Sequence, residues 1–221
     1  MTKISPTTRG PALAEYKKGL VLTQRQKSIA IGVILGDGSL QTQNKGKTHR
    51  IKFEQGLIHK AYMDHLYNEF FPWCLAEPKP PSKNRPNSLI MQTVGHEALN
   101  VFADLFLVGP RKGIPANLVR DHVTVISLAY WFMDDGGKLD YGPNKGKAIL
   151  LHTQGFTKEE VEDLAKGLRD KFNLQAEASL KKGQYVVCIS GHSFEDFMRL
   201  VEPHIIPEMR YKLPTPRKNK S

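Results

Sequence analysis

The chain has 221 residues, 40% of them hydrophobic, and its apolar runs fall well short of the roughly 20 residues needed to span a bilayer. A chain of this length can bury a core as one large domain or as two half-size units. Lysine and arginine exceed aspartate and glutamate by 32 to 22, which leaves a formal net charge of +10. A polyanion suits that charge, although a ribosome-associated or membrane-surface protein would carry it equally well, so the residues of the site must decide.

Both ends of the chain are basic. The first 28 residues carry six lysines and arginines against one acid, Glu15, so 1–22 is expected to form a basic arm or a transit segment. From Arg210 onward five residues are basic and none is acidic. The last residues, 215–221, are expected to be a basic tail that either contacts a polyanion or stays disordered.

The first half of the chain begins with an apolar helix predicted over 23–36. A polar hairpin follows, turning near Asn44, in which Ile51 and Phe53 alternate with charged residues and define an inward face. An amphipathic helix is predicted over 59–71. The second strand pair is obscured by four prolines between residues 78 and 86, and a last helix precedes Ile114.

The second half follows the same order. Its apolar helix is predicted over 125–134, and its middle helix over 157–172, where Thr157 and Glu160 form a capping-box pattern. Its second strand pair, 176–181 and 185–190, flanks a turn at Lys182-Gly183. Matching elements predict two half-domains of the α+β class.

The chain repeats itself once, at an offset near 98 residues. An apolar run that ends at Asp37 aligns with a second run that ends at Asp135, and three further pairs of segments follow in the same order. Four ordered matches indicate a duplicated unit, with half-domains over 23–121 and 122–214. The further pairs are Asn44-Lys45-Gly46-Lys47 with Asn144-Lys145-Gly146-Lys147, Gln55-Gly56-Leu57 with Gln154-Gly155-Phe156, and Leu107-Val108-Gly109-Pro110 with Leu200-Val201-Glu202-Pro203.

Each repeat carries an aspartate where its apolar helix ends, Asp37 in the first half and Asp135 in the second. A single Gly-Asp-Gly sequence is most often only a turn that ends a helix, but its duplication at equivalent positions favours a shared site. If the helices pack in parallel through small residues such as Gly32, both carboxylates lie where the negative ends of two helix dipoles meet. Like charges repel there unless a cation binds, and oxygen ligands suit Mg²⁺, with the carbonyls of Gly36 and Asp134 completing its coordination.

Such a site suits the hydrolysis of a phosphodiester. One metal ion lowers the pKa of the attacking water, and a second stabilises the leaving 3′ oxygen. The protein then needs mainly carboxylates and cations, and the candidate cations are Lys112 and Lys212, each close in sequence to an Ile-Pro pair. Taken singly, each lysine is more readily explained as a solvated surface charge.

The two apolar runs resemble the paired motifs of LAGLIDADG homing endonucleases of the monomeric, double-motif type. The runs are residues 31–38 (IGVILGDG) and 128–136 (LAYWFMDDG), and the segments 61–65 (AYMDH) and 211–214 (YKLP) extend the resemblance to about residues 20 to 214. Leu35 and Met133 stand where the family has an acid at the sixth position of the motif, and Tyr130 replaces the usual glycine of the second motif. No protein-splicing blocks flank the motifs, which favours a free-standing, intron-type enzyme.

The resemblance implies two pseudo-symmetric αββαββα half-domains, whose saddle-shaped antiparallel sheets enter the major groove and whose motif helices form a central seam. It also implies a monomer that cuts both strands of a long, pseudo-symmetric or asymmetric DNA site and leaves 3′ overhangs. Mg²⁺ is the expected cofactor, with Mn²⁺ able to substitute and Ca²⁺ supporting binding without cleavage. No membrane and no obligate protein partner is expected, and a mitochondrial or chloroplast location is expected because organelle introns commonly encode such relatives. Carried over by position, the metal ligands are Asp37, Asp135 and the carbonyls of Gly36 and Asp134, and the basic residues flanking the site are Lys112 and Lys212.

Binding to DNA is expected to combine phosphate contacts with base readout from the polar faces of the strands. For any one of the candidate residues, a solvated surface charge is the simpler explanation. The candidates in the first half are Gln41, Gln43, Asn44, Lys45, Lys47, Arg50, Lys52, Lys79, Lys83 and Arg85, and those in the second half are Lys145, Lys147, Lys181, Lys182 and Gln184.

Two other functions suit the same fold. One is a maturase that binds intron RNA and assists splicing, and the other is a DNA-binding regulator without catalysis. Because both aspartates and both lysines are present, a purely non-catalytic protein is disfavoured, while a dual role stays open.

Overall fold

The computed structural model describes residues 4–109, 111–140 and 147–213, so the predicted DNA contact at Lys145 and the predicted tail over 215–221 lie outside the described residues. Contacts divide the chain into two compact units. Unit 1 comprises Met1–Ala30 and Asp37–Asp104, and unit 2 comprises Ile31–Gly36 and Leu105–Ser221. The end of the first motif helix and residues 105–121, which the repeat places in the first half, therefore group with unit 2. Of the described helices, none is long and apolar enough to cross a membrane.

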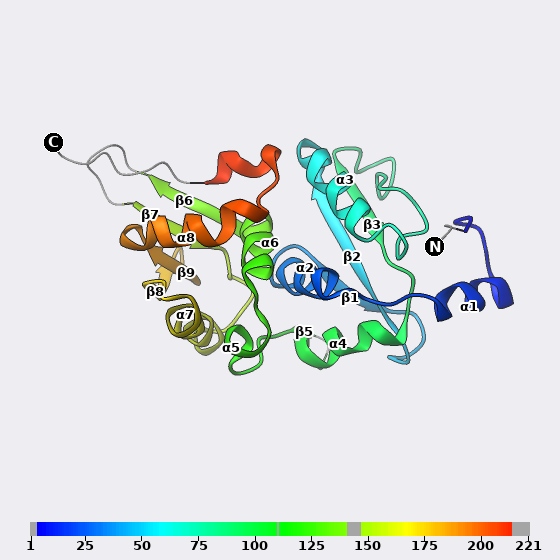
Figure 1. Ribbon diagram of the computed structural model, residues 1–221, viewed down its shortest axis with the longest axis horizontal. Helices are drawn as coiled ribbons and strands as arrows, with labels where there is room; N and C mark the ends of the chain where they lie inside the picture. Colours follow the sequence, from blue (N-terminus) through cyan, green and yellow to red (C-terminus); the bar gives the residue numbers. More distant parts are fainter. Residues whose placement is uncertain (1–3, 110, 141–146, 214–221) are drawn as a thin grey trace. The chain divides into compact units, whose positions relative to one another are not determined.

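Unit 1 is built on a three-stranded antiparallel sheet in the order β1-β2-β3 (Figure 1). Helix α3 packs against β2 and β3, and the rings of Phe53 and Phe70, 5.2 Å apart, lie in the core between them. The elements are α1 (Gly10–Lys18), α2 (Gln24–Leu35), which ends in unit 2, β1 (Ser39–Thr42), β2 (His49–Gly56), η1 (Leu57–His59), α3 (Lys60–Glu69), β3 (Ser88–Gln92), η2 (Glu97–Leu99) and α4 (Asn100–Phe106), which also continues into unit 2.

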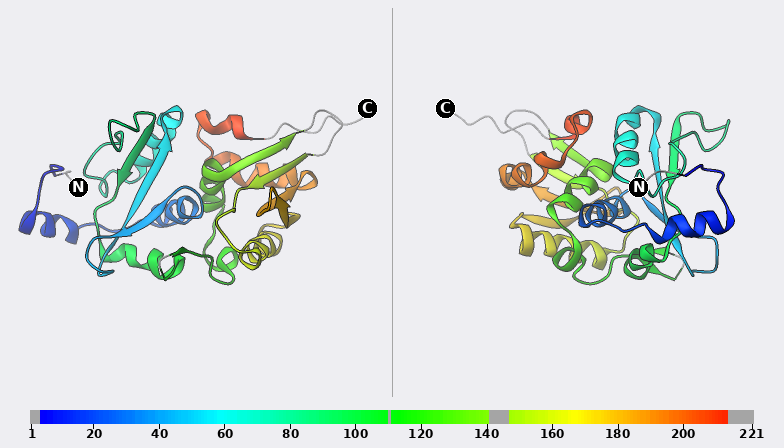
Figure 2. Two further views of the ribbon diagram at one scale, coloured as in Figure 1. Left: turned by 180° about the vertical axis from the view of Figure 1, so that it is seen from behind. Right: turned by 45° about the vertical axis from the view of Figure 1, so that its right-hand side comes forward.

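Unit 2 contains the run αββαββα that the resemblance implies for a half-domain. Its antiparallel sheet has the order β6-β7-β9-β8, α7 packs across β8 and β9, and α8 packs against α6 (Figure 2). The elements are β4 (Leu107–Val108), β5 (Arg111–Lys112), α5 (Leu118–His122), α6 (Val125–Asp135), β6 (Gly136–Asp140), β7 (Lys147–Leu151), α7 (Lys158–Phe172), β8 (Ala176–Lys181), β9 (Gln184–Ser190), η3 (Gly191–Ser193), α8 (Phe194–Val201), η4 (Glu202–His204) and η5 (Pro207–Lys212).

Local sequence signals account for several element ends. Thr157 caps α7 by accepting from the backbone N–H of Glu160, and the Glu160 side chain accepts from the backbone N–H of Thr157, so the predicted capping box is confirmed. Lys182 and Gly183 have φ values of 49° and 81°, a left-handed pair that suits the tight turn predicted between β8 and β9. In β2 the side chains alternate as predicted, with Ile51 and Phe53 buried.

The two sheets differ by one strand, because the segment of unit 1 that corresponds to β8 is rich in proline. Lys79 forms an isolated antiparallel bridge with Ile90, with reciprocal backbone hydrogen bonds of 3.0 and 2.8 Å. Pro78 and Pro80 flank this residue and have no N–H to donate, so the pairing does not extend into a strand. The sequence did not define the second strand pair of the first half. In the structure this pair consists of β3 and a single bridge at Lys79.

The first hairpins of the two units are related by a constant offset of 98 residues. Thr42 pairs with His49 as the last pair of β1 and β2, and Asp140 pairs with Lys147 as the last described pair of β6 and β7. Lys147 is therefore the counterpart of His49, and the match of Lys47 with Lys147 in the sequence alignment is two residues out of register. The error arose because turns of similar polar composition align by composition even when the strands around them do not.

Within unit 2, the end of α2 packs alongside α6 at equivalent positions of the repeat. A Cβ atom added to Gly32 would lie 2.3 Å from Ser127 O and 2.9 Å from Tyr130 Cβ, and one added to Gly36 would lie 2.4 Å from Asp134 Cβ. The contacts advance in the same direction along both helices, so the helices run parallel, as predicted. Glycine on the first helix alone permits this approach, which is how Tyr130 is accommodated in place of the second motif's usual glycine.

The replacement Gly32→Ala is expected to lower the free energy of unfolding by about 1–3 kcal/mol, because the backbone at Ser127 O would have to move. Gly155→Ala is the matched control, since a Cβ there meets nothing within 4 Å and its effect should stay within about 1 kcal/mol. Denaturant unfolding measures both variants. Equal stability of the two would contradict the close approach of α2 to α6.

Candidate active site

Asp37 and Asp135 lie at the C-terminal ends of the two motif helices. Asp37 is exposed and follows α2 by two residues, whereas Asp135 is half-buried and is the last residue of α6. The main-chain oxygen of Asp135 accepts a 2.9 Å hydrogen bond from the backbone N–H of His152. In unit 2, Gly36 and Asp134 are in contact, so the residues that immediately precede the two acids touch each other.

Lys112, in β5, lies at the end of the first motif helix. Its Nζ donates to the main-chain oxygens of Ile34 at 2.9 Å and Gly36 at 2.8 Å, and it sits 5.7 Å from the centre of the Phe156 ring. These carbonyls end the helix and carry the negative end of its dipole, so the ammonium group stabilises them.

Lys212, in η5, does the same at the second motif helix. Its Nζ donates to the main-chain oxygens of Met133 at 2.5 Å and Asp134 at 2.7 Å. Each of the two lysines predicted from the sequence therefore binds the carbonyl that immediately precedes one of the two acids. The contacts with Gly36 O and Asp134 O are equivalent under the repeat, whereas the second carbonyl differs, since Ile34 corresponds to Phe132 and not to Met133.

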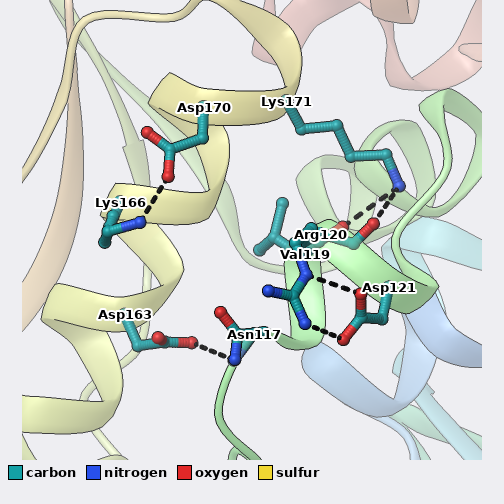
Figure 3. Close-up of polar contacts among 8 residues, drawn as sticks. All are labelled: Asn117, Val119, Arg120, Asp121, Asp163, Lys166, Asp170 and Lys171. Carbon is teal, nitrogen blue, oxygen red and sulfur yellow. Dashed lines mark hydrogen bonds and ion pairs between the residues drawn. The ribbon is translucent and has the colours of Figure 1, made fainter.

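A lysine that ends a helix in this way is not by itself a sign of function. Lys171 Nζ donates to the main-chain oxygens of Val119 at 3.2 Å and Arg120 at 2.9 Å near the end of α5, where neither acidic motif is involved (Figure 3). What distinguishes Lys112 and Lys212 is the identity of the carbonyls they bind. Lys171 therefore offers a natural comparison for the stability contribution of such a contact.

Glu160 anchors the segment that carries Lys112. Its carboxylate accepts from Arg111 Nη2 and from the backbone N–H of Ile114, both at 3.0 Å, and it also caps α7. Burial would raise the pKa of Glu160, but the hydrogen bonds from Arg111, Thr157 and Ile114 together lower it below its ordinary value. The ionised carboxylate thus fixes β5 to the start of α7.

Gln55 also belongs to the site, although the sequence analysis did not predict it as a site residue. Its Nε2 donates to Asp37 Oδ2 at 3.0 Å, and the side chain is buried, with 7% of its surface exposed. The signal was present in the alternation of β2, where a polar Gln55 follows the inward-facing Ile51 and Phe53. A polar side chain on the buried face of a strand needs a partner, and here the partner is the acid.

The surroundings of Asp135 differ from those of Asp37. By the 98-residue register the counterpart of Gln55 is Thr153, whose hydroxyl donates to Tyr185 O at 3.2 Å, and not Gln154 as the alignment suggested. Next to it is His152, where burial and then the charge of Lys212 lower the pKa of the imidazole. The two acids therefore have chemically unequal neighbours.

The candidate DNA contacts of unit 1 gather on the polar face of β1 and β2 and in their turn. Arg50 Nη2 donates to Gln41 Oε1 at 3.1 Å, and both Lys52 and Arg85 form ion pairs with Glu54. Hydrogen bonding from Lys52, which outweighs the opposing effect of burial, holds the pKa of Glu54 below its usual range. The exposed turn carries Gln43, Asn44, Lys45 and Lys47, while Lys79 and Lys83 lie in the segment before β3.

The candidate DNA contacts of unit 2 are more dispersed. Lys181, Lys182 and Gln184 are exposed around the β8–β9 turn. Lys147 begins β7 and is buried, with 8% of its surface exposed. It lines a cleft of unit 2 together with Arg169, Gln175 and Ser190, and its predicted contact with DNA stays a prediction.

The donors near the motif ends suit a hard cation. Among the described residues there is no group of three or more His, Cys, Asp or Glu side chains that could hold a metal ion. The oxygen donors at the end of each motif helix are an aspartate carboxylate and the main-chain carbonyl of the residue before it. This oxygen-only set, with few protein ligands, fits Mg²⁺ and does not fit zinc.

Comparisons with known proteins agree with this architecture. A probable intron-encoded endonuclease 1 of Wickerhamomyces canadensis is 38% identical over 208 residues, which cover 91% of this chain and 89% of the relative. DNA endonuclease I-ChuI of Chlamydomonas applanata is 28% identical over 211 residues, 87% of this chain and 95% of that protein. The solved structure of the homing endonuclease I-WcaI bound to its DNA recognition sequence has a TM-score of 0.86 at 37% identity, covering 96% of this chain and 95% of that chain. The family profile of the LAGLIDADG DNA endonucleases matches residues 27–197, and the chain belongs to this family.

Proposed function

We propose that the protein is a site-specific double-strand DNA endonuclease of the intron-type homing class, which hydrolyses phosphodiesters with a divalent metal ion and leaves 3′ overhangs. The observation that carries this proposal is the contact of Gly36 with Asp134, each bound by its own lysine and each followed by an aspartate. Capping of the helix ends accounts for the two lysines, but it does not account for two aspartates placed beside the negative ends of two helix dipoles. The chemistry of this arrangement is that of a cation site beside a phosphate.

The acids and carbonyls supply the metal ligands. Asp37 and Asp135, with the main-chain oxygens of Gly36 and Asp134, offer hard oxygen donors, and Gln55 orients the Asp37 carboxylate through its amide. A divalent ion bound there lowers the pKa of a water molecule and stabilises the leaving 3′ oxygen.

The lysines supply positive charge at the same place. Lys112 and Lys212 hold their ammonium groups against the carbonyls that precede the acids. Charge developing on the scissile phosphate is thus met by groups that need no rearrangement during the reaction.

DNA is held by the polar strand faces. Arg50, Lys52 and Gln41 on β1 and β2, and Lys181 with Gln184 at the β8–β9 turn, are candidates for phosphate and base contacts. Both motifs lie in one chain, so we infer that the protein acts as a monomer. We also infer an organelle location, in keeping with the intron-encoded relative.

The test is selection of cleaved sites from a pool of randomised duplexes. With Mg²⁺ the protein is expected to cut one long site and to leave 3′ overhangs, which sequencing of the ends would reveal. Removal of the metal with EDTA should abolish cutting, Mn²⁺ should restore it, and Ca²⁺ should support binding alone. If no duplex is cut with either metal while splicing of an intron RNA is stimulated, the maturase alternative replaces the proposal.

A further inference from the structure

The N-terminal helix α1 is part of the fold of unit 1. Tyr16 is 7% exposed and donates its hydroxyl to Pro72 O at 2.7 Å, and Leu20 just after the helix is 5% exposed. The ring nitrogen Nε2 of His96 lies 3.0 Å from Lys17 O, which ties the end of the helix to the segment after β3. These contacts hold the C-terminal end of α1 against unit 1.

A basic cleft separates α1 from that sheet. It measures about 390 Å³, and its described lining residues include the cations Arg9, Lys17 and Arg50 and the amides of Gln43 and Gln92, but no acid. The positive net charge of the chain does not by itself explain this lining, because a cleft of unit 2 between α7 and β8 is lined mainly by acidic residues. That cleft is lined by Glu159, Glu162, Asp163 and Glu177 together with Lys166 and Arg169.

The basic cleft continues the polar face of the sheet at its turn end. Gln92 pairs with Lys52, and Arg50 lies two residues along β2 on the same side as Lys52, so all three belong to one face. Figures 1 and 2 show α1 beside the end of β1 and β2 that carries their turn. A duplex that followed the polar face outward from Asp37 would meet the cleft next.

We propose that α1 and the turn end of β1 and β2 together clamp a backbone phosphate of DNA that flanks the cleavage site on the side of unit 1. The proposal rests on the proposed function, since it extends the DNA surface of the same enzyme. Arginine and lysine in a partly enclosed cleft concentrate positive potential, and a phosphodiester is the anion that a DNA-binding face presents to them. The chain from Asp37 to Gln43, of which Ser39–Thr42 is strand, can span at most roughly 20 Å, the length of about six base pairs.

The experiment removes one charge at a time from α1 or from Arg9, the residue before it, and measures binding to the target site in Ca²⁺ over a range of salt concentrations. Arg9→Ala and Lys17→Ala are each expected to weaken binding by about 3- to 10-fold and to reduce the slope of log affinity against log salt by about 1. The single-turnover cleavage rate at saturating protein should not change. Lys18→Ala is the matched control, because Lys18 follows directly on the same helix, pairs with Glu15 on the surface and does not line the cleft.

A second arm changes the DNA and leaves the protein intact. On a duplex trimmed to about five base pairs on either side of the cut, wild type and Lys17→Ala are expected to bind equally, because the flanking phosphate is gone. A methylphosphonate placed at the flanking position should weaken binding by wild type, and should weaken binding by Lys17→Ala less, because that variant keeps only Arg9 and Arg50 in the cleft. This arm does not depend on the stability of any variant.

Three results would overturn the clamp. One is that Arg9→Ala and Lys17→Ala behave like Lys18→Ala, another is that their defect persists on the trimmed duplex, and the third is that no flanking methylphosphonate affects wild type. None of these results contradicts the proposed endonuclease function, provided that the wild-type protein cuts its site. Failure of wild type to cut any duplex would instead remove the proposed function.

Discussion

Replacing Asp37 or Asp135 by asparagine is expected to abolish cleavage while leaving DNA affinity within a few-fold of wild type. The amide keeps the size of the side chain but removes the charge that a hard cation requires of its ligand. We expect the single-turnover rate in Mg²⁺ to fall by about a thousand-fold or more in either variant. In EDTA, binding should be equal or tighter, because one negative charge beside the phosphates has been removed.

Asp64→Asn is the control for this pair. Asp64 lies on α3, where its carboxylate forms an exposed ion pair with Lys60 at 2.5 Å, so its loss should not affect cutting. Separate measurement of the two DNA strands adds information, because Asp37 has Gln55 beside it and Asp135 has His152 nearby in the strand register. Loss of one strand's cleavage alone would contradict shared metal ions, and loss of binding together with cleavage would indicate that the acids have a structural role.

Replacing Lys112 or Lys212 by methionine is expected to lower the cleavage rate at saturating protein by about a hundred-fold, with DNA affinity changed only a few-fold. Methionine keeps the length of the side chain but cannot place a positive charge beside the carbonyl of Gly36 or Asp134. Unfolding free energy should also fall, by about 1–3 kcal/mol, because two helix-end carbonyls lose a charged donor. Single-turnover cleavage and denaturant unfolding measure the two effects independently.

Lys171→Met separates catalysis from capping. Lys171 binds Val119 O and Arg120 O in the same way, so its replacement should give a comparable loss of stability (Figure 3). Its cleavage rate should equal that of wild type at a temperature where all variants are folded. If Lys171→Met lost activity as fully as Lys112→Met, the lysines at the motif ends would be structural caps and nothing more.

Much of the fold was predictable from local signals. The apolar helices that end near Asp37 and Asp135, the Thr157 capping box and the Lys182-Gly183 turn each depend on a few neighbouring residues. Such signals act within one or two turns of chain, so they are readable without knowledge of the rest of the molecule. The duplication of the acidic motif is likewise visible in the sequence alone, and it predicted the two-unit α+β architecture.

The contacts between residues distant in sequence depend on tertiary packing and could not be predicted from local signals. Lys112 and Lys212 bind carbonyls between 76 and 79 residues away in sequence, Gln55 meets Asp37 across a strand pair, and α1 docks on unit 1 through Tyr16. The alignment placed Lys147 opposite Lys47, and strand pairing showed that its counterpart is His49. A slip of one or two residues in a polar turn leaves its composition almost unchanged, whereas only backbone pairing and burial of one face determine the register of a strand. The sequence by itself therefore determined which acids and cations the protein carries, and the tertiary structure decided which of them meet.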